Sequence, residues 1–338
     1  MKTELLGVSD DDIRYAGEII RSGGLVGMPT ETVYGLAGNA LSGDCVRKIY
    51  AAKGRPSDNP LIVHISSIDE WSPLVTEIPE SAKKLAEKFW PGPLTIILNK
   101  SDIVPNETSG NLKTVAVRVP SDENARRLIK SAGLPIAAPS ANTSGKPSPT
   151  SAQHVMNDLD GKIEAVIDGG ECSVGVESTV ITLVTDPPRL LRPGGVTPEM
   201  IESVIGEIEI DDAVYNKLED GAKAASPGMK YKHYSPSARV ILLKGEFEKY
   251  KKYIEDNKTT ATVALCFDGE EKELSVPCLP YGRESDSLSQ AQHIFSRLRQ
   301  ADEMGADIVF ARYPERTGVG LAVYNRLIRA AAFEVIEL

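Results

Sequence analysis

The residues best suited to chemistry are two cations, Lys53 and Arg55, which are separated by one glycine and followed by Pro56. Because Pro56 disfavours helical geometry at Arg55, we expect both side chains to project from the same side of an extended or turning segment. Neighbouring cations repel each other unless an anion lies between them, and a phosphate suits an arginine fork beside a lysine point charge. A solvated basic turn is the simpler interpretation. The apolar run within 59–65 favours the phosphate site, because it holds the cations at the edge of a strand.

Two segments rich in hydroxyl and amide groups follow predicted strands. Residues 29–36 (PTETVYGL) come after the short apolar run 25–28, and residues 139–150 (PSANTSGKPSPT) come after 134–138. Hydroxyl, amide and backbone donors at a strand end suit phosphate or ribose oxygens. A threonine-rich turn and a flexible Ser/Pro-rich linker are the respective alternatives. The sequence contains no GxxxxGK[ST] phosphate loop.

Two further arginines have unusual surroundings in the sequence. Arg118 lies in the apolar strand pattern 114–120, where a cation needs a carboxylate partner. That partner is either a carboxylate of this chain or the carboxylate of a substrate. Arg192 is followed by a proline, as Arg55 is, and is another candidate contact for phosphate.

The sequence lacks the usual signs of a protein nucleophile or a bound metal. It has no GxSxG, CxxC or HExxH motif, and its cysteines and histidines are dispersed. The cationic and hydroxyl-rich segments therefore favour a reaction in which the substrates carry the nucleophile while the protein binds, orients and neutralises charge. Phosphoryl or nucleotidyl transfer is such a reaction.

The elements that must position these residues form two α/β domains. Residues 1–210 are expected to make the first domain, with helices at 9–22, 43–52, 81–90, 122–132 and 198–206 and strands at 25–28, 61–65, 94–98, 114–120, 134–138 and 163–167. Residues 238–338 alternate strands (240–243, 262–267, 306–311) with helices (246–257, 288–304, 319–333), which predicts a smaller parallel α/β domain.

Residues 211–237 are predicted to link the two domains. This segment has no apolar periodicity, yet it contains the basic, aromatic run MKYKHY. A plain linker is one interpretation. The other, which we favour, is an arm that covers the active site.

Composition limits the classes of partner. The chain has 338 residues, with 48 acidic against 38 basic side chains and a net charge of −10, which argues weakly against a general nucleic-acid coat. It shows no signal-peptide pattern and no apolar run approaching about 18 residues. We expect a soluble, cytoplasmic protein that does not bind membranes.

The order of the motifs, taken together, resembles the two-domain form of the YrdC-like threonylcarbamoyl-AMP synthase family. The segments that carry this resemblance are PTETVYGL, KGRPSDNPLIVHI, FWPGPLTIIL, AVRVP, PSANTSGKPSPT, DGG, ESTVI, LRPGGVT and SPGMKYKHYSP. The resemblance implies a twisted mixed sheet with a concave, basic face in the first domain, and a Rossmann-like second domain.

The resemblance also implies a reaction. A nucleotidyltransferase of this family takes L-threonine, bicarbonate and ATP with Mg²⁺, and yields threonylcarbamoyl-AMP, pyrophosphate and water. The product feeds a tRNA threonylcarbamoyl-transfer complex that modifies an adenosine next to the anticodon. Stable direct binding of tRNA is not expected.

The family's site residues map onto this sequence. Lys53 and Arg55 are implied to be catalytic. The residues implied to bind ATP are Lys53, Arg55, Asn59, Thr114, Ser140, Asn142, Ser148, Arg192 and Tyr234. The residues implied to bind threonine are Thr32, His64, Arg118, Ala138 (through its backbone) and Ser178. No metal ligand is assigned.

Two rival functions remain at this point. An RNA-binding factor could use the same basic cleft without chemistry, although the net charge of −10 counts against it. A carbamoyl-transferring maturation enzyme would be expected to carry acylphosphatase-like and zinc-finger segments, which this sequence lacks.

Overall fold

The computed structural model describes residues 2–57, 59–217 and 234–338, which form two units. The first unit contains residues 2–144 and 148–214 apart from the gap at 58, and the second contains 145–147, 215–217 and 234–338. Most of the predicted linker lies outside the described residues. Its proposed cover over the active site and the domain limits 1–210, 211–237 and 238–338 therefore stay predictions.

The first unit is built on one mixed sheet with the strand order β1-β8-β2-β3-β7-β4-β6-β5-β9-β10-β11. Its strands are β1 (Glu4–Leu6), β2 (Val26–Met28), β3 (Gly35–Asn39), β4 (Ile62–His64), β5 (Leu94–Asn99), β6 (Thr114–Arg118), β7 (Ile136–Ala137), β8 (Ala165–Ile167), β9 (Thr179–Thr182), β10 (Arg189–Arg192) and β11 (Glu209–Ile210). The central strand β4 pairs in parallel with β6 and antiparallel with β7. The candidate residue His64 lies on β4, Thr114 and Arg118 lie on β6, and Ala138 directly follows β7.

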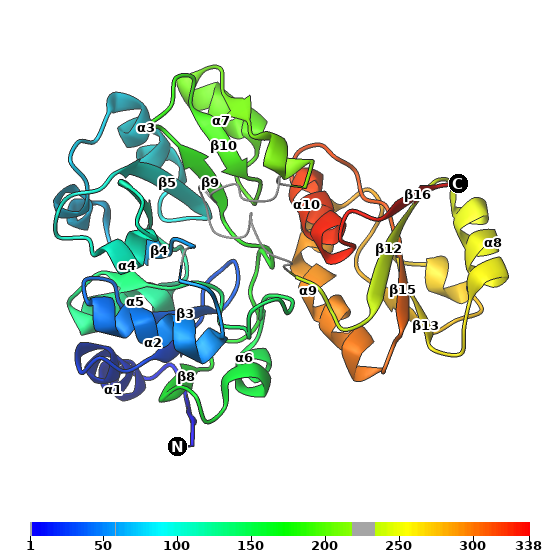
Figure 1. Cartoon of the computed structure of the whole chain (residues 1–338), viewed down its shortest axis with the longest axis horizontal. Helices are drawn as coiled ribbons and strands as arrows, with labels where there is room; N and C mark the ends of the chain where they lie inside the picture. The colour runs from blue at the N-terminus through cyan, green and yellow to red at the C-terminus, as the bar shows by residue number, and fades with distance from the viewer. Residues whose placement is uncertain (1, 58, 218–233) are drawn as a thin grey trace. The chain divides into compact units, whose positions relative to one another are not determined.

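Helices cover this sheet with apolar faces. They are α1 (Asp10–Arg21), α2 (Gly43–Lys53), α3 (Glu80–Phe89), α4 (Asn106–Ser109), α5 (Glu123–Ala132), α6 (Ala152–Leu159) and α7 (Pro198–Ile205). Helices α1 and α5 lie side by side (Figure 1) and bury Ile13, Ile20 and Leu128 in one core cluster. Ser9 and Asp122 cap their N-termini, as expected for these residue types.

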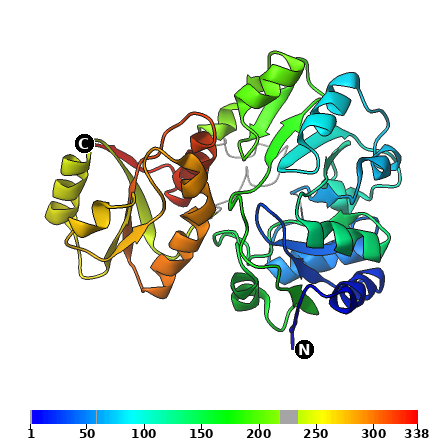
Figure 2. The ribbon, with the colours of Figure 1, turned by 180° about the vertical axis from the view of Figure 1, so that it is seen from behind.

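The second unit is a smaller, all-parallel sheet of five strands in the order β14-β13-β15-β12-β16. Its strands are β12 (Arg239–Lys244), β13 (Thr262–Cys266), β14 (Cys278–Pro280), β15 (Ile308–Arg312) and β16 (Val335–Glu337), and its helices are α8 (Phe247–Asn257), α9 (Ser287–Glu303) and α10 (Gly320–Ala330). Figures 1 and 2 show α8 on one face of this sheet and α9 and α10 on the other. No helix in the described ranges is long and apolar enough to cross a membrane.

The predicted fold class is confirmed: the chain is α/β, with a large mixed sheet and a separate parallel sheet. The sequence interpretation missed β3, in which two glycines lower the strand propensity. The predicted strand 134–138 shrinks to Ile136–Ala137, because Pro135 cannot donate a backbone hydrogen bond to the sheet.

Candidate active site

Lys53 and Arg55 lie on either side of a turn rather than on one extended segment, and the helix predicted for 43–52 reaches Lys53. Lys53 is the last residue of α2, and Gly54 ends the helix with φ of +62°, a left-handed conformation that favours glycine. Pro56 restricts only Arg55, so the helix continues to Lys53. Arg55 follows as a half-buried residue whose backbone N–H donates to the carbonyl of Tyr50.

The ammonium group of Lys53 is buried and holds the second hydroxyl-rich segment. Nζ donates to the carbonyl oxygens of Ser140 and Asn142, the latter at 2.6 Å, and lies 3.4 Å from Asn142 Oδ1. In return, the backbone N–H of Ser144 donates to the carbonyl of Lys53 at 2.8 Å. The structure thus brings together three of the residues predicted to bind ATP. Lys53 joins the loop to the end of α2.

A second anchor of this loop was not identified from the sequence. Asp158, on the inward face of α6, accepts a hydrogen bond from the backbone N–H of Thr143 at 3.2 Å. Its own backbone carbonyl accepts from the Thr143 hydroxyl, also at 3.2 Å. The available signal was an acidic residue on the apolar side of the helix, since buried aspartates usually have a specific partner. The loop that carries Ser140 and Asn142 is therefore fixed from two sides.

Arg118, Thr32 and His64, all predicted to bind threonine, lie together. Arg118 ends β6 and pairs in register with His64 on β4. Its Nη1 donates to Thr32 Oγ1 at 2.9 Å, its Nε donates to the carbonyl of Gly92 at 3.1 Å, and its Nη2 lies 2.7 Å from Glu31 Oε1. The partner expected for Arg118 within the chain is thus Glu31. Its contact with a substrate carboxylate stays a prediction.

Burial controls the protonation of this cluster. Desolvation, reinforced by the positive charge of Arg118, lowers the pKa of His64 to about 3, so its imidazole is neutral. Burial would raise the pKa of Glu31, but Arg118 and the backbone N–H of Ser121 outweigh it and lower that pKa. The cluster therefore holds one cation and one anion beside a neutral histidine.

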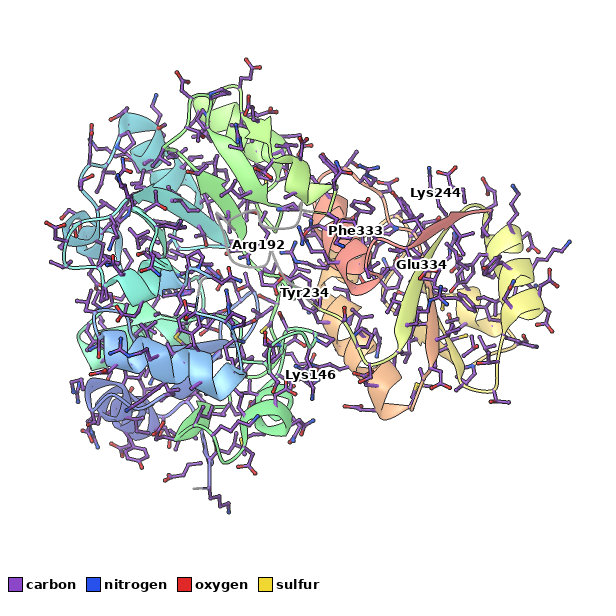
Figure 3. All side chains as sticks on the ribbon, in the orientation of Figure 1. Lys146, Arg192, Tyr234, Lys244, Phe333 and Glu334 are labelled. Atoms are coloured by element: carbon purple, nitrogen blue, oxygen red, sulfur yellow. The ribbon has the colours of Figure 1, made fainter. Side chains whose placement is uncertain are left out.

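A second cluster joins β5, β9 and β10. Arg192 (Figure 3) donates from Nε to the carbonyl of Ser178 at 3.0 Å and from Nη2 to its hydroxyl at 3.2 Å. The same hydroxyl lies 2.8 Å from Thr95 Oγ1. At Gly194 a side chain would come within 2.3 Å of the backbone nitrogen of Thr179, so only glycine allows this close approach. Ser178 and Arg192, predicted for different substrates, are direct neighbours.

Ser148 and Asn59 are also buried polar residues. Ser148 donates to the carboxylate of Glu177, which precedes Ser178 in the chain. Asn59 is fully buried, yet within the described ranges neither atom of its side-chain amide has a hydrogen-bond partner. Buried amides without partners are rare, so an amide donor and acceptor remain for a ligand.

The other candidates are less closely associated. Ala138 follows β7, and its backbone N–H donates to the carbonyl of Ile62 on β4, near His64. Thr114 begins β6 whereas Arg118 ends it, which separates the two by roughly 13 Å of extended chain. The structure therefore does not bring Thr114 beside the threonine cluster.

Tyr234, labelled in Figure 3, belongs to the second unit and is a buried residue. Its ring centroid lies 5.2 Å from that of Phe295, and the guanidinium of Arg326 lies 5.6 Å from the Tyr234 ring. Its predicted contact with ATP stays a prediction, as does every other role assigned to a site residue.

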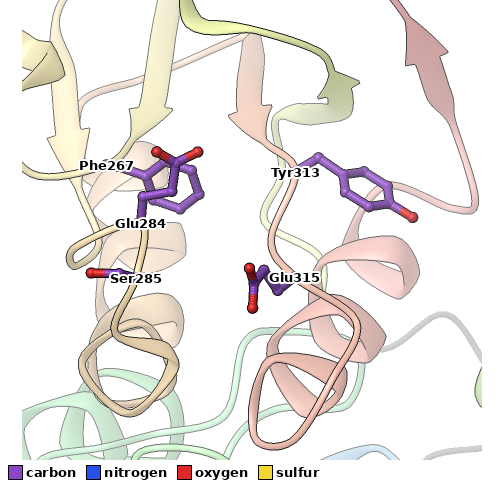
Figure 4. Close-up of a pocket in the computed structure, with 5 residues that line it drawn as sticks. All are labelled: Phe267, Glu284, Ser285, Tyr313 and Glu315. Carbon is purple, nitrogen blue, oxygen red and sulfur yellow. The ribbon is translucent and has the colours of Figure 1, made fainter.

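The second unit has a pocket at the carboxyl ends of its strands, where parallel sheets often bind nucleotides. This cavity of about 300 Å³ is lined by Phe267, Glu284, Ser285, Tyr313 and Glu315 (Figure 4). Two lining carboxylates would repel a phosphate. The lining of this pocket therefore does not favour a phosphate group, and the ATP site predicted in the first unit stays a prediction.

Within the described ranges, no group of three or more His, Cys, Asp or Glu side chains could hold a metal ion. This donor set does not fit a resident metal held by the protein alone. A magnesium ion would need ligands from another source, such as the phosphate oxygens of a nucleotide.

Comparisons with known proteins match the chain almost end to end. A Sua5/YciO/YrdC family model described as "Telomere recombination" matches residues 18–194, and the model "Threonylcarbamoyl-AMP synthase, C-terminal domain" matches 196–332. The chain is 51% identical to threonylcarbamoyl-AMP synthase of Pyrococcus abyssi (96% of both chains) and 46% identical to that of Bacillus subtilis (99% of this chain, 97% of the relative). A crystal structure of P. abyssi Sua5 complexed with L-threonine superposes with a TM-score of 0.90 at 47% identity, covering 99% of this chain and all of the other.

Proposed function

The chain belongs to the threonylcarbamoyl-AMP synthase family, and we propose that it makes threonylcarbamoyl-AMP from L-threonine, bicarbonate and ATP. The structural observation that supports this most directly is the Arg118 cluster. It is a buried guanidinium with a hydroxyl and a neutral imidazole beside it, close to the strand end that leads into the Ser140 loop. An α-amino acid carboxylate fits such a guanidinium.

The amino acid would be held by the residues around Arg118. The guanidinium binds the carboxylate of threonine, and the buried groups of Thr32, His64 and Ser178 and the backbone of Ala138 surround the rest of the substrate. Because His64 is neutral, it adds no competing positive charge near Arg118.

ATP would lie over the segments joined by Lys53. Ser140, Asn142, Ser148 and Arg192 supply hydroxyl, amide and guanidinium groups. The amide of Asn59, which has no partner among the described residues, can bind a polar group of the nucleotide. Thr114 and Tyr234 complete the set that the family relationship assigns. Mg²⁺ would be bound through the ATP phosphates and offset part of their charge.

The reaction is adenylyl transfer to a carbamate, which makes the protein a nucleotidyltransferase. The amine of threonine combines with bicarbonate to give N-carboxythreonine and water. A carbamate oxygen then attacks the α-phosphorus, and the bond to the β-phosphate breaks to release pyrophosphate. Arg55 neutralises the charge that moves toward pyrophosphate, and Lys53 orients the Ser140–Asn142 loop against the nucleotide.

The product supplies threonylcarbamoyl transfer to an adenosine next to the anticodon of tRNA. We place this activity in the cytoplasm. A separate transfer complex, not this chain, would hold the tRNA.

The test is a chromatographic assay for an AMP adduct that depends on threonine and bicarbonate, with release of pyrophosphate. Lys53→Ala and Arg55→Ala should each lower turnover at least about 100-fold. The first variant loses the orientation of the Ser140–Asn142 loop, and the second loses a charge-stabilising contact. Lys53→Ala should also lower thermal stability, because its ammonium holds the loop.

Lys48→Ala, which removes an exposed cation from the same helix, is the matched control and should keep normal turnover. Near-normal activity in both site variants would contradict the proposal. RNA binding without adduct formation would favour the RNA-binding alternative.

A further inference from the structure

Glu31 is a buried carboxylate, and in the described part of the chain only one of its two oxygens has a partner. Its side chain lies in the turn after β2 and is 6% exposed. Oε1 accepts from the backbone N–H of Ser121 at 3.0 Å and lies 2.7 Å from Arg118 Nη2. Oε2 is buried and has no hydrogen-bond partner within the described part of the chain. A buried anionic oxygen without a donor is costly, so this atom indicates a missing partner.

The surroundings of Oε2 indicate a cation as that partner. Arg118 is already bound to Thr32 and Gly92, and the nearby histidine, His64, is uncharged. Asp122 also acts on Glu31 with a like charge. If a substrate carboxylate binds Arg118, two carboxylates share one guanidinium and the cluster carries a net negative charge.

An α-amino acid resolves this imbalance because it brings its own cation. In the zwitterion, the ammonium group is one carbon away from the carboxylate. A ligand whose carboxylate binds Arg118 can therefore direct its ammonium group toward the carboxylate already paired with that arginine. Arg118, Glu31 and the two charged groups of the ligand then make two cations and two anions, with Asp122 as a further acidic group nearby.

We propose that Glu31 binds the α-ammonium group of threonine through Oε2 while Arg118 binds its α-carboxylate, an inference that rests on the proposed function. Glu31, which is not among the site residues predicted from the sequence, is thereby assigned to recognition of the amino acid. Its contribution is to binding rather than to turnover, because the ammonium must lose a proton before the nitrogen attacks carbon. Removing Glu31 should raise KM for threonine and leave kcat similar.

The inference is tested by calorimetric titration with three ligands at pH 7.5. These are threonine, 2-aminobutanoate, which lacks the β-hydroxyl, and 2,3-dihydroxybutanoate, in which a hydroxyl replaces the ammonium. Glu31→Gln should raise the Kd for threonine and for 2-aminobutanoate by about 10- to 100-fold, which corresponds to the loss of a hydrogen bond to a charged group. The same variant should bind 2,3-dihydroxybutanoate with unchanged or higher affinity, because the Glu31 carboxylate no longer repels this anionic ligand.

Two variants serve as controls. Glu31→Asp keeps the charge and should keep a preference for ligands with an ammonium group. Glu164→Gln changes a half-buried carboxylate that accepts from the backbone N–H of Leu25, away from the Arg118 cluster, and should bind all three ligands as the unaltered protein does. Thermal unfolding of each variant checks that it is folded.

The outcomes separate the inference from the proposed function. If Glu31→Gln lowered the affinity for all three ligands equally, Glu31 would have a purely structural role, and the inference would be overturned. If Glu31→Gln lowered the affinity for threonine but not that for 2-aminobutanoate, Glu31 would contact the β-hydroxyl rather than the ammonium group. That result would also overturn the inference. If the unaltered protein and Glu164→Gln bind no threonine at all, the proposed function fails instead.

Discussion

Arg118 and Arg312 occupy the same kind of position in two different sheets, yet their surroundings differ. Each is the last residue of a strand, β6 in the mixed sheet and β15 in the parallel sheet. Both side chains are almost fully buried. Arg118 faces one carboxylate, and one oxygen of that carboxylate has no hydrogen-bond partner among the described residues. Arg312 is enclosed by acceptors and aromatic rings.

The enclosure of Arg312 comes from several elements of the second unit. Its Nε lies 3.0 Å from Glu270 and its Nη2 lies 3.2 Å from Glu284, while Nη1 donates to the carbonyl of Gly245 at 2.7 Å. Its guanidinium also lies within 5.4 Å of the ring centroids of Tyr250 and Phe267. The second oxygen of Glu270 accepts from the backbone N–H of Phe267. This arginine is part of the core.

A buried arginine at a strand end is thus weak evidence for a binding site. What distinguishes Arg118 is the incomplete set of partners around it: one carboxylate, one hydroxyl and one carbonyl, with Glu31 Oε2 still without a donor in the described residues. A substrate that carries both a carboxylate and an ammonium group would supply the missing partners of Arg118 and Glu31. Arg312 already has two carboxylates beside it.

The largest expected difference is in catalysis. Arg118→Met should lower turnover of threonine at least about 100-fold, because a buried partner of the substrate carboxylate is lost. Arg312→Met should leave the affinity for threonine unchanged, although it lowers the free energy of unfolding by about 3–5 kcal/mol by leaving the largely buried carboxylate of Glu270 unpaired. Adduct formation and denaturant unfolding measure the two effects.

The double variant Arg118→Met/Glu31→Gln separates stability from function at the first site. It removes both charges of the pair and should recover part of the stability lost in Arg118→Met, but none of the activity. If Arg312→Met lowered threonine affinity as strongly as Arg118→Met, the distinction between the two arginines would be wrong.

The two regions should also respond oppositely to acid. The pKa of His64, beside Arg118, is lowered by burial to about 3, against about 6.5 in an unfolded chain. Between these values the unfolded state binds a proton that the folded state excludes, so stability is lost as pH falls. Burial raises the pKa of Glu270, beside Arg312, so its protonation favours the folded state as pH falls toward 4.5.

We expect His64 to account for about 2 kcal/mol of the stability lost between pH 7 and pH 5. Denaturant unfolding of the unaltered protein and of His64→Gln at both pH values measures this difference. His293→Gln, in the second unit, is the control and should retain the full loss. An unchanged pH dependence in His64→Gln would show that another group causes it.

The sequence was sufficient for the α/β class, most helices and the grouping of Thr32, His64 and Arg118, because apolar periodicity and the ordered motifs specify them. It was not sufficient for the position of Lys53, since the left-handed turn at Gly54 lets the helix run further than the following proline suggested. The contacts of Glu31 and Asp158 also could not be deduced, because each joins segments more than 10 residues apart through tertiary packing.

The smallest expected effect concerns the carboxylate of Glu284, which lines the pocket of the second unit. Its side chain is 70% exposed, although it contacts Arg312. Exposed ion pairs contribute about 1 kcal/mol or less, since water and salt screen them. Glu284→Gln should therefore change the free energy of unfolding by less than about 1 kcal/mol, whereas Glu270→Gln, at a 13% exposed side chain, should cost more. If both variants lowered the free energy of unfolding equally in a denaturant titration, the exposed Glu284 would matter to Arg312 as much as Glu270 does. The partners of Arg312 would then be no more complete than those of Arg118.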